Sequence, residues 1–232
     1  MQKKRKKRKG RKAAVIIIVV VLILLALGVA YLALRQIGRL DREASGIAQM
    51  NMEEGTVDRT VYTSGGYGQV EDTIKAYMEE YVNTLQAARG VLQEEEFSNL
   101  LGADNLAADG PGFETSLAYL EEKQSEADAD FEKLLKMAEE SEIMAAIEEK
   151  GVNPYFEFLY RREMLDTLQP VMYTAEELQA ARDSINASIE SRRELLAFLA
   201  EQQEHWELVN GRVNFDAGEL LNQYNALVEA VG

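Results

Sequence analysis

The feature that most constrains this chain is an uncharged apolar stretch near its beginning. Residues 13–34 are twenty-two residues without a charged side chain, most of them Val, Ile, Leu or Ala. At about 1.5 Å of rise per residue, a helix of that length measures roughly 33 Å, against a bilayer hydrocarbon core of about 30 Å. The stretch therefore predicts a transmembrane signal-anchor helix that contacts the lipid bilayer over 13–34.

The charges that flank this stretch predict its orientation. Residues 3–12 include nine lysines and arginines and no acid, whereas the first residues beyond the span mix three arginines with Asp41 and Glu43. By the positive-inside rule, residues 1–12 are a basic cytoplasmic head, and the C-terminal domain is extracytoplasmic. We expect a single-pass plasma-membrane protein whose head lies on anionic lipid headgroups. A basic arm also suits nucleic acid, but a head of twelve residues held against a bilayer favours the topology signal, so no nucleic-acid partner is expected.

A cleaved signal peptide is the competing interpretation of the same stretch. Gly28 and Ala30 supply small residues at the spacing that signal peptidases use. The apolar run, however, continues to Leu34 and is longer than the core of a secretory signal, which favours retention in the membrane. The chain contains no cysteine, so the exported part must be held together by core packing without disulfides.

The part beyond the head is strongly acidic. The net charge of the chain is −15 with its nine N-terminal cations included, so residues 13–232 carry −24. We expect such a domain to be soluble and to be repelled by nucleic acid and anionic lipid. Only three prolines interrupt it, which permits long helices.

Residues 35–68 are predicted to be a juxtamembrane stalk and linker. Ile37, Leu40, Ala44 and Ile47 recur at spacings of three and four, as in an amphipathic helix, which we expect to continue to Glu54 and stop at Gly55. A stripe this narrow suits packing against the domain, or against a second copy in a homodimer. Four glycines with several Thr and Ser residues predict a linker over 55–68.

Residues 69–232 are predicted to be an acidic helical-bundle ectodomain. A first helix, at about 69–92, has an apolar face, with Glu71 and Lys75 on its other faces. A second long helix carries the clearest coiled-coil heptad, which predicts an antiparallel hairpin with the first. The residues of this heptad are Phe113, Leu117, Leu120, Gln124, Ala127, Phe131, Leu134 and Ala138.

The C-terminal part predicts one more long helix and a change of period. Thr174 and Glu177 form a capping-box pattern at the start of that helix. Apolar residues alternate on both sides of Asn210-Gly211, which predicts a small β-hairpin with Trp206 as its anchor on the bundle. Asp216 is expected to cap a last helix. The predicted fold class is therefore all-α, with one transmembrane helix, an antiparallel helical bundle and a β-hairpin near the C-terminus.

An aromatic segment after Pro154 is the candidate surface for a partner. Four aromatic residues within six positions cannot all face one side of a helix, so this segment is either buried between two layers or partly exposed. The candidate partner surface consists of Tyr155, Phe156, Phe158, Tyr160, Arg161 and Trp206.

Reactive residues are few. His205 is the one histidine, and its position predicts a junction between helix and strand. Asp104, Asn105, Asp109 and Glu114 invite a calcium interpretation, but they lack the spacing of an EF-hand loop and are better explained by turns and helix caps. Acid pairs are too numerous to single out a catalytic one. We therefore predict no enzyme activity, no cofactor and no metal site.

Three classes of function are compatible with this organisation. The favoured one is a membrane-anchored extracytoplasmic helical module that acts in protein–protein interaction or envelope structure. The alternative is a sensor or ligand-binding ectodomain that signals through a separate partner, since the cytoplasmic head has only twelve residues. An envelope enzyme is the third class, and no convergent set of reactive residues supports it.

Overall fold

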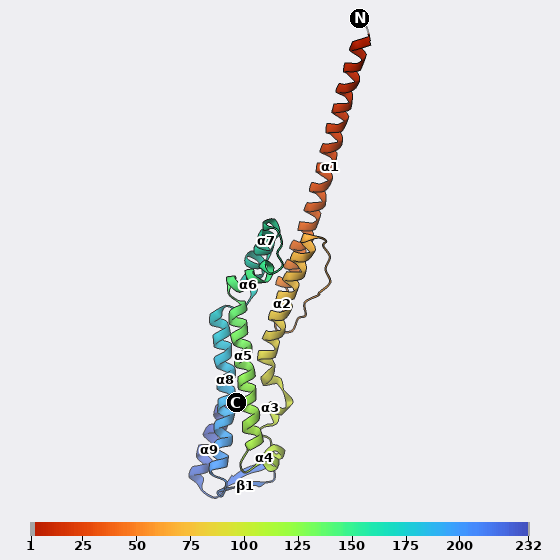
Figure 1. Cartoon of the computed structure of the whole chain (residues 1–232). Coiled ribbons are helices and arrows are strands. Elements are labelled where there is room, and N and C mark those ends of the chain that lie inside the picture. The colour runs from red at the N-terminus through yellow and green to blue at the C-terminus, as the bar shows by residue number, and fades with distance from the viewer. Residues whose placement is uncertain (1–2, 232) are drawn as a thin grey trace.

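The structure is a computed structural model that describes residues 3–231. Its first element, α1 (Lys3–Ala48), is one continuous helix that projects from a helical domain and enters it with its last turns (Figure 1). Large apolar side chains of α1 between Ile17 and Leu34 are exposed, and this helix is long and apolar enough to span a membrane. The headgroup contacts predicted for residues 1–12 lie outside the side chains that the structure describes.

The end of α1 differs from the predicted one. The helix ends at Ala48 and does not reach Glu54. Beyond it, the Asn51 side chain accepts a hydrogen bond from the amide of Glu53, and the Asn51 carbonyl accepts one from the amide of Gly55. Asparagine side chains compete with helical hydrogen bonds in this way, so the chain turns here.

Residues 35–68 contribute to the core of the domain. Leu40 and Ala44 of α1 are buried, and so are Met52 and Val57 of the return segment, residues 49–65. The return segment leads back along the domain from the end of α1 to the start of α2 (Gly66–Gly90), as Figure 1 shows. The apolar stripe predicted for the stalk therefore packs against the domain.

Short elements connect the long helices of the domain. After α2 come η1 (Val91–Gln93), α3 (Glu95–Asn99), α4 (Ala103–Asp109), α5 (Glu114–Met137), α6 (Glu140–Glu148) and α7 (Pro154–Arg161). The chain continues from α7 through the π-helix η2 (Arg162–Leu168) and the 3-10 turn η3 (Gln169–Val171) into α8 (Ala175–Glu201). It ends with β1 (Trp206–Val209), β2 (Arg212–Phe215) and α9 (Gly218–Val231).

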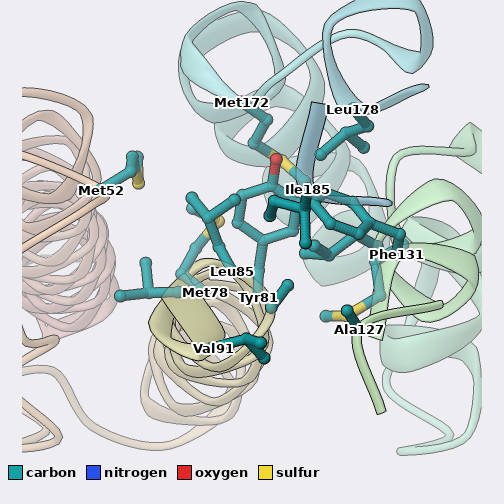
Figure 2. Packing of buried hydrophobic residues seen from close by; sticks show 14 of the residues in the cluster. Met52, Met78, Tyr81, Leu85, Val91, Ala127, Phe131, Met172, Leu178 and Ile185 are labelled. Carbon is teal, nitrogen blue, oxygen red and sulfur yellow. The ribbon is translucent and has the colours of Figure 1, made fainter. Parts of the chain in front are cut away.

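The main core lies between α2, α5 and α8, which pack side by side (Figure 1). Figure 2 shows Tyr81 of α2 close to Ile185 of α8 and Phe131 of α5. The predicted heptad is confirmed, since its buried members are Phe113, Leu120, Ala127, Phe131 and Leu134. Each large apolar side chain buried in this way contributes about 1.5–3 kcal/mol, so this seam fixes the antiparallel pairing of α2 and α5.

Both predicted local signals at the C-terminal end are confirmed. The Thr174 side chain accepts a hydrogen bond from the Glu177 amide, and the Glu177 carboxylate accepts one from the Thr174 amide. These two bonds complete the capping box of α8. β1 and β2 pair with Trp206 opposite Phe215, around a turn in which Asn210 and Gly211 have φ angles of 52° and 75°. Positive φ at both positions is what a type I′ hairpin turn requires.

Trp206 anchors the hairpin to the bundle, as the sequence predicts. Its Nε1 donates a hydrogen bond of 2.7 Å to the carbonyl of Leu199 in α8. Its ring is stacked on that of Phe113, with 6.1 Å between the ring centroids. Phe113 is fully buried and keeps a left-handed backbone, with φ 54°, just before α5. That conformation costs a non-glycine residue about 1–2 kcal/mol, which the buried stacking offsets.

The cap predicted for the last helix is wrong. α9 begins at Gly218, and the carboxylate of Asp216 instead lies 3.1 Å from Nδ1 of His205. The apolar face of α9 is only partly covered by α8, because Leu221 and Val228 are exposed while Leu220 and Tyr224 are half-buried. α9 therefore leaves an apolar stripe open to solvent.

Two buried tyrosines provide a matched test of this packing. The Tyr160 hydroxyl is buried and has no hydrogen-bond partner among the described residues, whereas the Tyr77 hydroxyl donates to the carbonyl of Met137. We expect Tyr160→Phe to raise the free energy of unfolding by about 1 kcal/mol, because it removes an unsatisfied polar group. Tyr77→Phe should lower it by about 1 kcal/mol. Urea unfolding of the full chain in detergent measures both, and equal losses in the two variants would contradict this packing.

Candidate functional site

The domain has two ends of different character, and the candidate sites lie there. The near end is where α1 enters the domain, next to the return segment, the start of α2, and α7. The far end carries the hairpin and α9 (Figure 1). Long helices separate the two ends, so each is described in turn.

Hydrogen bonds hold α1 against the return segment at the near end. The Gln36 side chain donates to the Ser64 hydroxyl at 2.9 Å, and the Arg39 guanidinium donates to the carbonyl of Tyr62 at 3.1 Å. Two residues after Arg39, Asp41 of α1 pairs with Arg162 of the π-helix η2. The last turns of α1 are therefore tied to two separate parts of the domain.

A buried ionic network lies about one turn further along α1, at Glu43. The Lys75 ammonium is 2.9 Å from the Glu71 carboxylate, one turn earlier in α2, and 2.7 Å from the Glu43 carboxylate of α1. Glu71 also accepts hydrogen bonds from the amides of Tyr62 and Thr63 and from the Thr63 hydroxyl. The network thus joins α1, the return segment and α2 through charged groups.

The burial of this pair was not predicted from the sequence. Glu71 and Lys75 were expected on the polar faces of their helix, but the side chains of both are only 1% exposed. The return segment covers that face of α2, and its Thr60 carbonyl accepts a hydrogen bond from Lys75. An i, i+4 acid–base pair beside a segment rich in Thr and Gly gives little sign of burial, because exposed helix faces carry many such pairs.

Neighbouring groups keep both members of the buried pair charged. Burial by itself would raise the pKa of Glu71, but hydrogen bonds from Tyr62, Thr63 and Lys75 hold it below its usual value. Burial would likewise lower the pKa of Lys75, but Glu43 and Glu71 hold it above its usual value. The network is therefore ionised and stabilising at neutral pH.

Glu163 is a buried acid with the opposite pKa shift. It lies in η2, accepts a 2.8 Å hydrogen bond from Nε of Arg162, and has a side chain that is 3% exposed. Burial raises its pKa above the usual value despite the favourable effect of Arg162. The ionised form of Glu163 is therefore opposed by its surroundings, unlike that of Glu71.

The predicted partner surface divides between the two ends of the domain. Tyr155 and Phe158 of α7 are exposed, and Phe156 packs edge-on against Tyr67 with ring centroids 5.1 Å apart. Arg161 pairs with Glu140. Two residues do not fit the prediction: Tyr160 is fully buried in the core, and Trp206 anchors the hairpin at the far end. The interpretation of α7 as a helix buried nearly all round is also wrong.

Apolar residues that the sequence does not single out also lie at the near end of the domain. Val61 and Tyr62 of the return segment are exposed, and the Tyr67 hydroxyl lies 3.4 Å from that of Tyr155. The glycines around Val61 and Tyr62 predict a linker, so the sequence does not single out this pair. The aromatic surface, as we define it, consists of the exposed residues Tyr155 and Phe158 of α7.

His205 lies at the junction of α8 and β1, as predicted. It borders a shallow hollow of about 200 Å³ that is lined by Glu204, His205, Trp206, Glu207, Asn214 and Asp216. Nδ1 of His205 is 3.1 Å from the Asp216 carboxylate, but no Ser, Thr or Cys is among the lining residues. The hollow therefore does not present a nucleophile to the histidine.

Asn105 and Asp109, two of the four residues that invite a calcium interpretation, bond to groups within the domain. The Asp109 carboxylate accepts hydrogen bonds from the amides of Thr115 and Ser116 at the start of α5. The Asn105 side chain donates to the Ser116 hydroxyl and to the Leu100 carbonyl. Among the described residues, no group of three or more His, Asp or Glu side chains is placed to hold a metal ion.

A second hollow lies near the end of α5. It measures about 400 Å³ and is lined by Leu135, Ala138, Glu139, Gln169, Met172, Tyr173, Thr174 and Ala175. Four of these eight residues are aliphatic or Met, and Glu139, Gln169, Tyr173 and Thr174 add polar groups. Its volume lies within the range of small-molecule sites.

Comparisons of this chain with protein-family models, with curated proteins and with solved structures each find no match. Its function must therefore be inferred from its own residues.

The two buried glutamates at the near end provide a matched pair of variants. We expect Glu71→Gln to lower the free energy of unfolding at pH 7 by about 3 kcal/mol, because it leaves Lys75 without its fully buried partner. Glu163→Gln should leave the free energy of unfolding within about 0.5 kcal/mol or raise it, because burial opposes the charge that it removes. Urea unfolding of the full chain in detergent measures both. Similar large losses of unfolding free energy in the two variants would contradict the different roles assigned to Glu71 and Glu163.

The same network predicts how stability depends on pH. The pKa of Glu71 is lower in the folded chain than in the unfolded chain, where it is near 4.5. Its stabilisation is therefore complete above that value and is lost as the pH falls through the folded pKa. Glu71→Gln should flatten this acid loss of stability, as measured by melting temperatures between pH 7 and pH 3. If the melting temperature of the variant falls with pH as steeply as that of the original chain, the role assigned to Glu71 is contradicted.

Proposed function

We propose that this chain is a single-pass membrane protein that holds an acidic helical domain on the extracytoplasmic side to bind a partner protein. Three features support the proposal. α1 is long and apolar enough to cross the bilayer. The nine cations before it favour a cytoplasmic N-terminus, and the acidic composition suits an exported soluble domain.

The observation that carries the proposal is the continuity of α1. One helix runs from the apolar stretch to Ala48, and its last part is buried in the domain through Leu40, Ala44 and Ile47. A flexible linker would let the domain tilt freely relative to the membrane. A helix that is packed into the domain instead fixes the angle of the domain to the membrane normal. Such an arrangement suits a module that presents one surface at a set distance from the bilayer.

The stripe on α9 is the surface that we assign to the partner. Leu221, Tyr224 and Val228 follow the i, i+3, i+7 spacing by which a helix presents itself to another helix. Leu221 and Val228 are exposed, and α9 lies at the end of the domain away from the start of α1 (Figure 1). We infer that the partner contributes an amphipathic helix with an apolar face.

The proposed topology can be tested with single cysteines, because the chain has none of its own. A cysteine at the exposed Ser141 should react with a membrane-impermeant maleimide in intact cells. A cysteine at Gln2 should react only after the membrane is made permeable. The reverse pattern, or equal labelling at both positions, would contradict the proposed orientation.

The assignment of α9 can be tested with a photo-crosslinking amino acid in living cells. We expect one discrete adduct from Leu221 or Val228 and none from Gln223, an exposed residue on another face of α9. Mass spectrometry should map the partner's side of the adduct to the apolar face of a helix. An adduct with twice the mass of the chain would instead indicate a homodimer. Equal yields at all three positions would contradict the stripe as the binding surface.

A ligand-binding sensor is the second candidate, and the 400 Å³ hollow beside Tyr173 favours it. Tyr173 bonds to both Glu53 and Arg89, so an occupant could act on the turn that follows α1. A melting temperature that does not respond to a broad panel of metabolites and envelope fragments would remove this candidate.

A further inference from the structure

Half of the exposed large apolar side chains described beyond α1 lie at the near end of the domain. Among the described residues beyond α1, the large apolar side chains that remain exposed are Val61, Tyr62, Tyr155, Phe158, Val171, Val209, Leu221 and Val228. The first four lie on the return segment and on α7. This end therefore contains the aromatic surface, Tyr155 and Phe158.

Hydrogen bonds from α1 give the end of the return segment a defined height relative to the predicted span. Gln36 bonds to Ser64, and Arg39 bonds to the carbonyl of Tyr62. These α1 residues follow Leu34 by two and five positions, which is about 3–8 Å of helical rise. The headgroup layer on each side of a bilayer is about 5–7 Å thick. The backbone at the end of the return segment is therefore at headgroup height if the span ends at Leu34.

α7 is held at the same height by the start of α2. Phe156 fills the space beside Gly66, where a β-carbon would lie 2.1 Å from its ring. Tyr67 contacts Tyr155 through their hydroxyls and packs against the ring of Phe156. Tyr155 and Phe158 are three residues apart, so they share one exposed face of α7. Figure 1 shows α7 at the end of the domain that α1 enters.

We propose that the aromatic surface inserts into the headgroup layer of the same bilayer that α1 spans. This inference rests on the proposed function, because it requires α1 to span the membrane. Tyrosine rings favour this layer because one end is apolar and the other is polar. Arg35 is exposed one residue after the span and can reach lipid phosphates from α1. The bilayer is thus the occupant that the position of this surface favours, over a soluble protein.

A second contact with the bilayer gives the domain one preferred rotation. A single transmembrane helix leaves a rigid domain free to turn about the helix axis. With α7 in the headgroup layer, the domain is held at two points, and the stripe on α9 then faces a set direction. Because residues 13–232 carry −24, the contact should be made with zwitterionic rather than anionic lipids.

The test uses the full chain in phosphatidylcholine nanodiscs. A bimane fluorophore is attached to a single cysteine at Tyr155 or Phe158, and quenching by nitroxides on the lipid headgroup or deep in the acyl chains is compared. Leu25 in the span and Leu221 on α9 are the control positions, and all four side chains are exposed. We expect headgroup nitroxides to quench Tyr155 and Phe158 at least about twofold more than Leu221. Leu25 should be quenched by the deep nitroxides.

The outcomes separate this inference from the proposed function. Quenching at Leu25 with no excess at Tyr155 and Phe158 over Leu221 would overturn the headgroup contact and leave the span intact. The aromatic surface would then be available to a soluble protein. No quenching at Leu25 would overturn the span, and the headgroup contact with it. Variants that fold poorly are recognised by their circular dichroism, and Phe158→Trp in a Trp206→Phe background, read by its own fluorescence, repeats the measurement without a label.

Discussion

The structure depends on one helix, α1, whose sequence must suit both the lipid bilayer and the core of the domain. Residues 13–34 of α1 are apolar all round, which suits lipid, whereas the last turns of the helix present a narrow apolar stripe to the domain. Lipid exposure requires every backbone polar group to be bonded within the helix, and continuation into the domain keeps that pattern unbroken. The position and orientation of the domain both follow from this continuity.

Charged groups at the entry point of α1 make the attachment specific. Apolar packing alone would allow α1 to slide or rotate against α2 by a turn. The buried contacts of Lys75 with Glu71 and Glu43 permit only one register, since any shift would leave a buried charge without its partner. The pairing of Asp41 with Arg162 adds a second fixed point on η2. The buried charged groups therefore fix the register of α1 against α2 more than they add to net stability.

Local rules predicted much of this fold from the sequence. The heptad of α5, the capping box at Thr174 and the Asn210-Gly211 turn are short-range patterns, and each is confirmed. The end of α1, the π-helix η2 and the burial of Glu71 depend on what packs nearby, which periodicity does not report. The same reason explains the partner surface: helix spacing puts Tyr155 and Phe158 on one face, but only the fold separates Tyr160 and Trp206 from them.

The central claim is that α1 is one rigid helix from the bilayer into the core. Spin labels at Ile18 and Arg42, both exposed on α1, allow a direct test by double electron–electron resonance in nanodiscs. Twenty-four residues of unbroken helix separate them by about 36 Å, so one narrow distance distribution near that value is predicted. A broad distribution, or two separate distances, would mean that the chain bends at the membrane surface, and would contradict the claim.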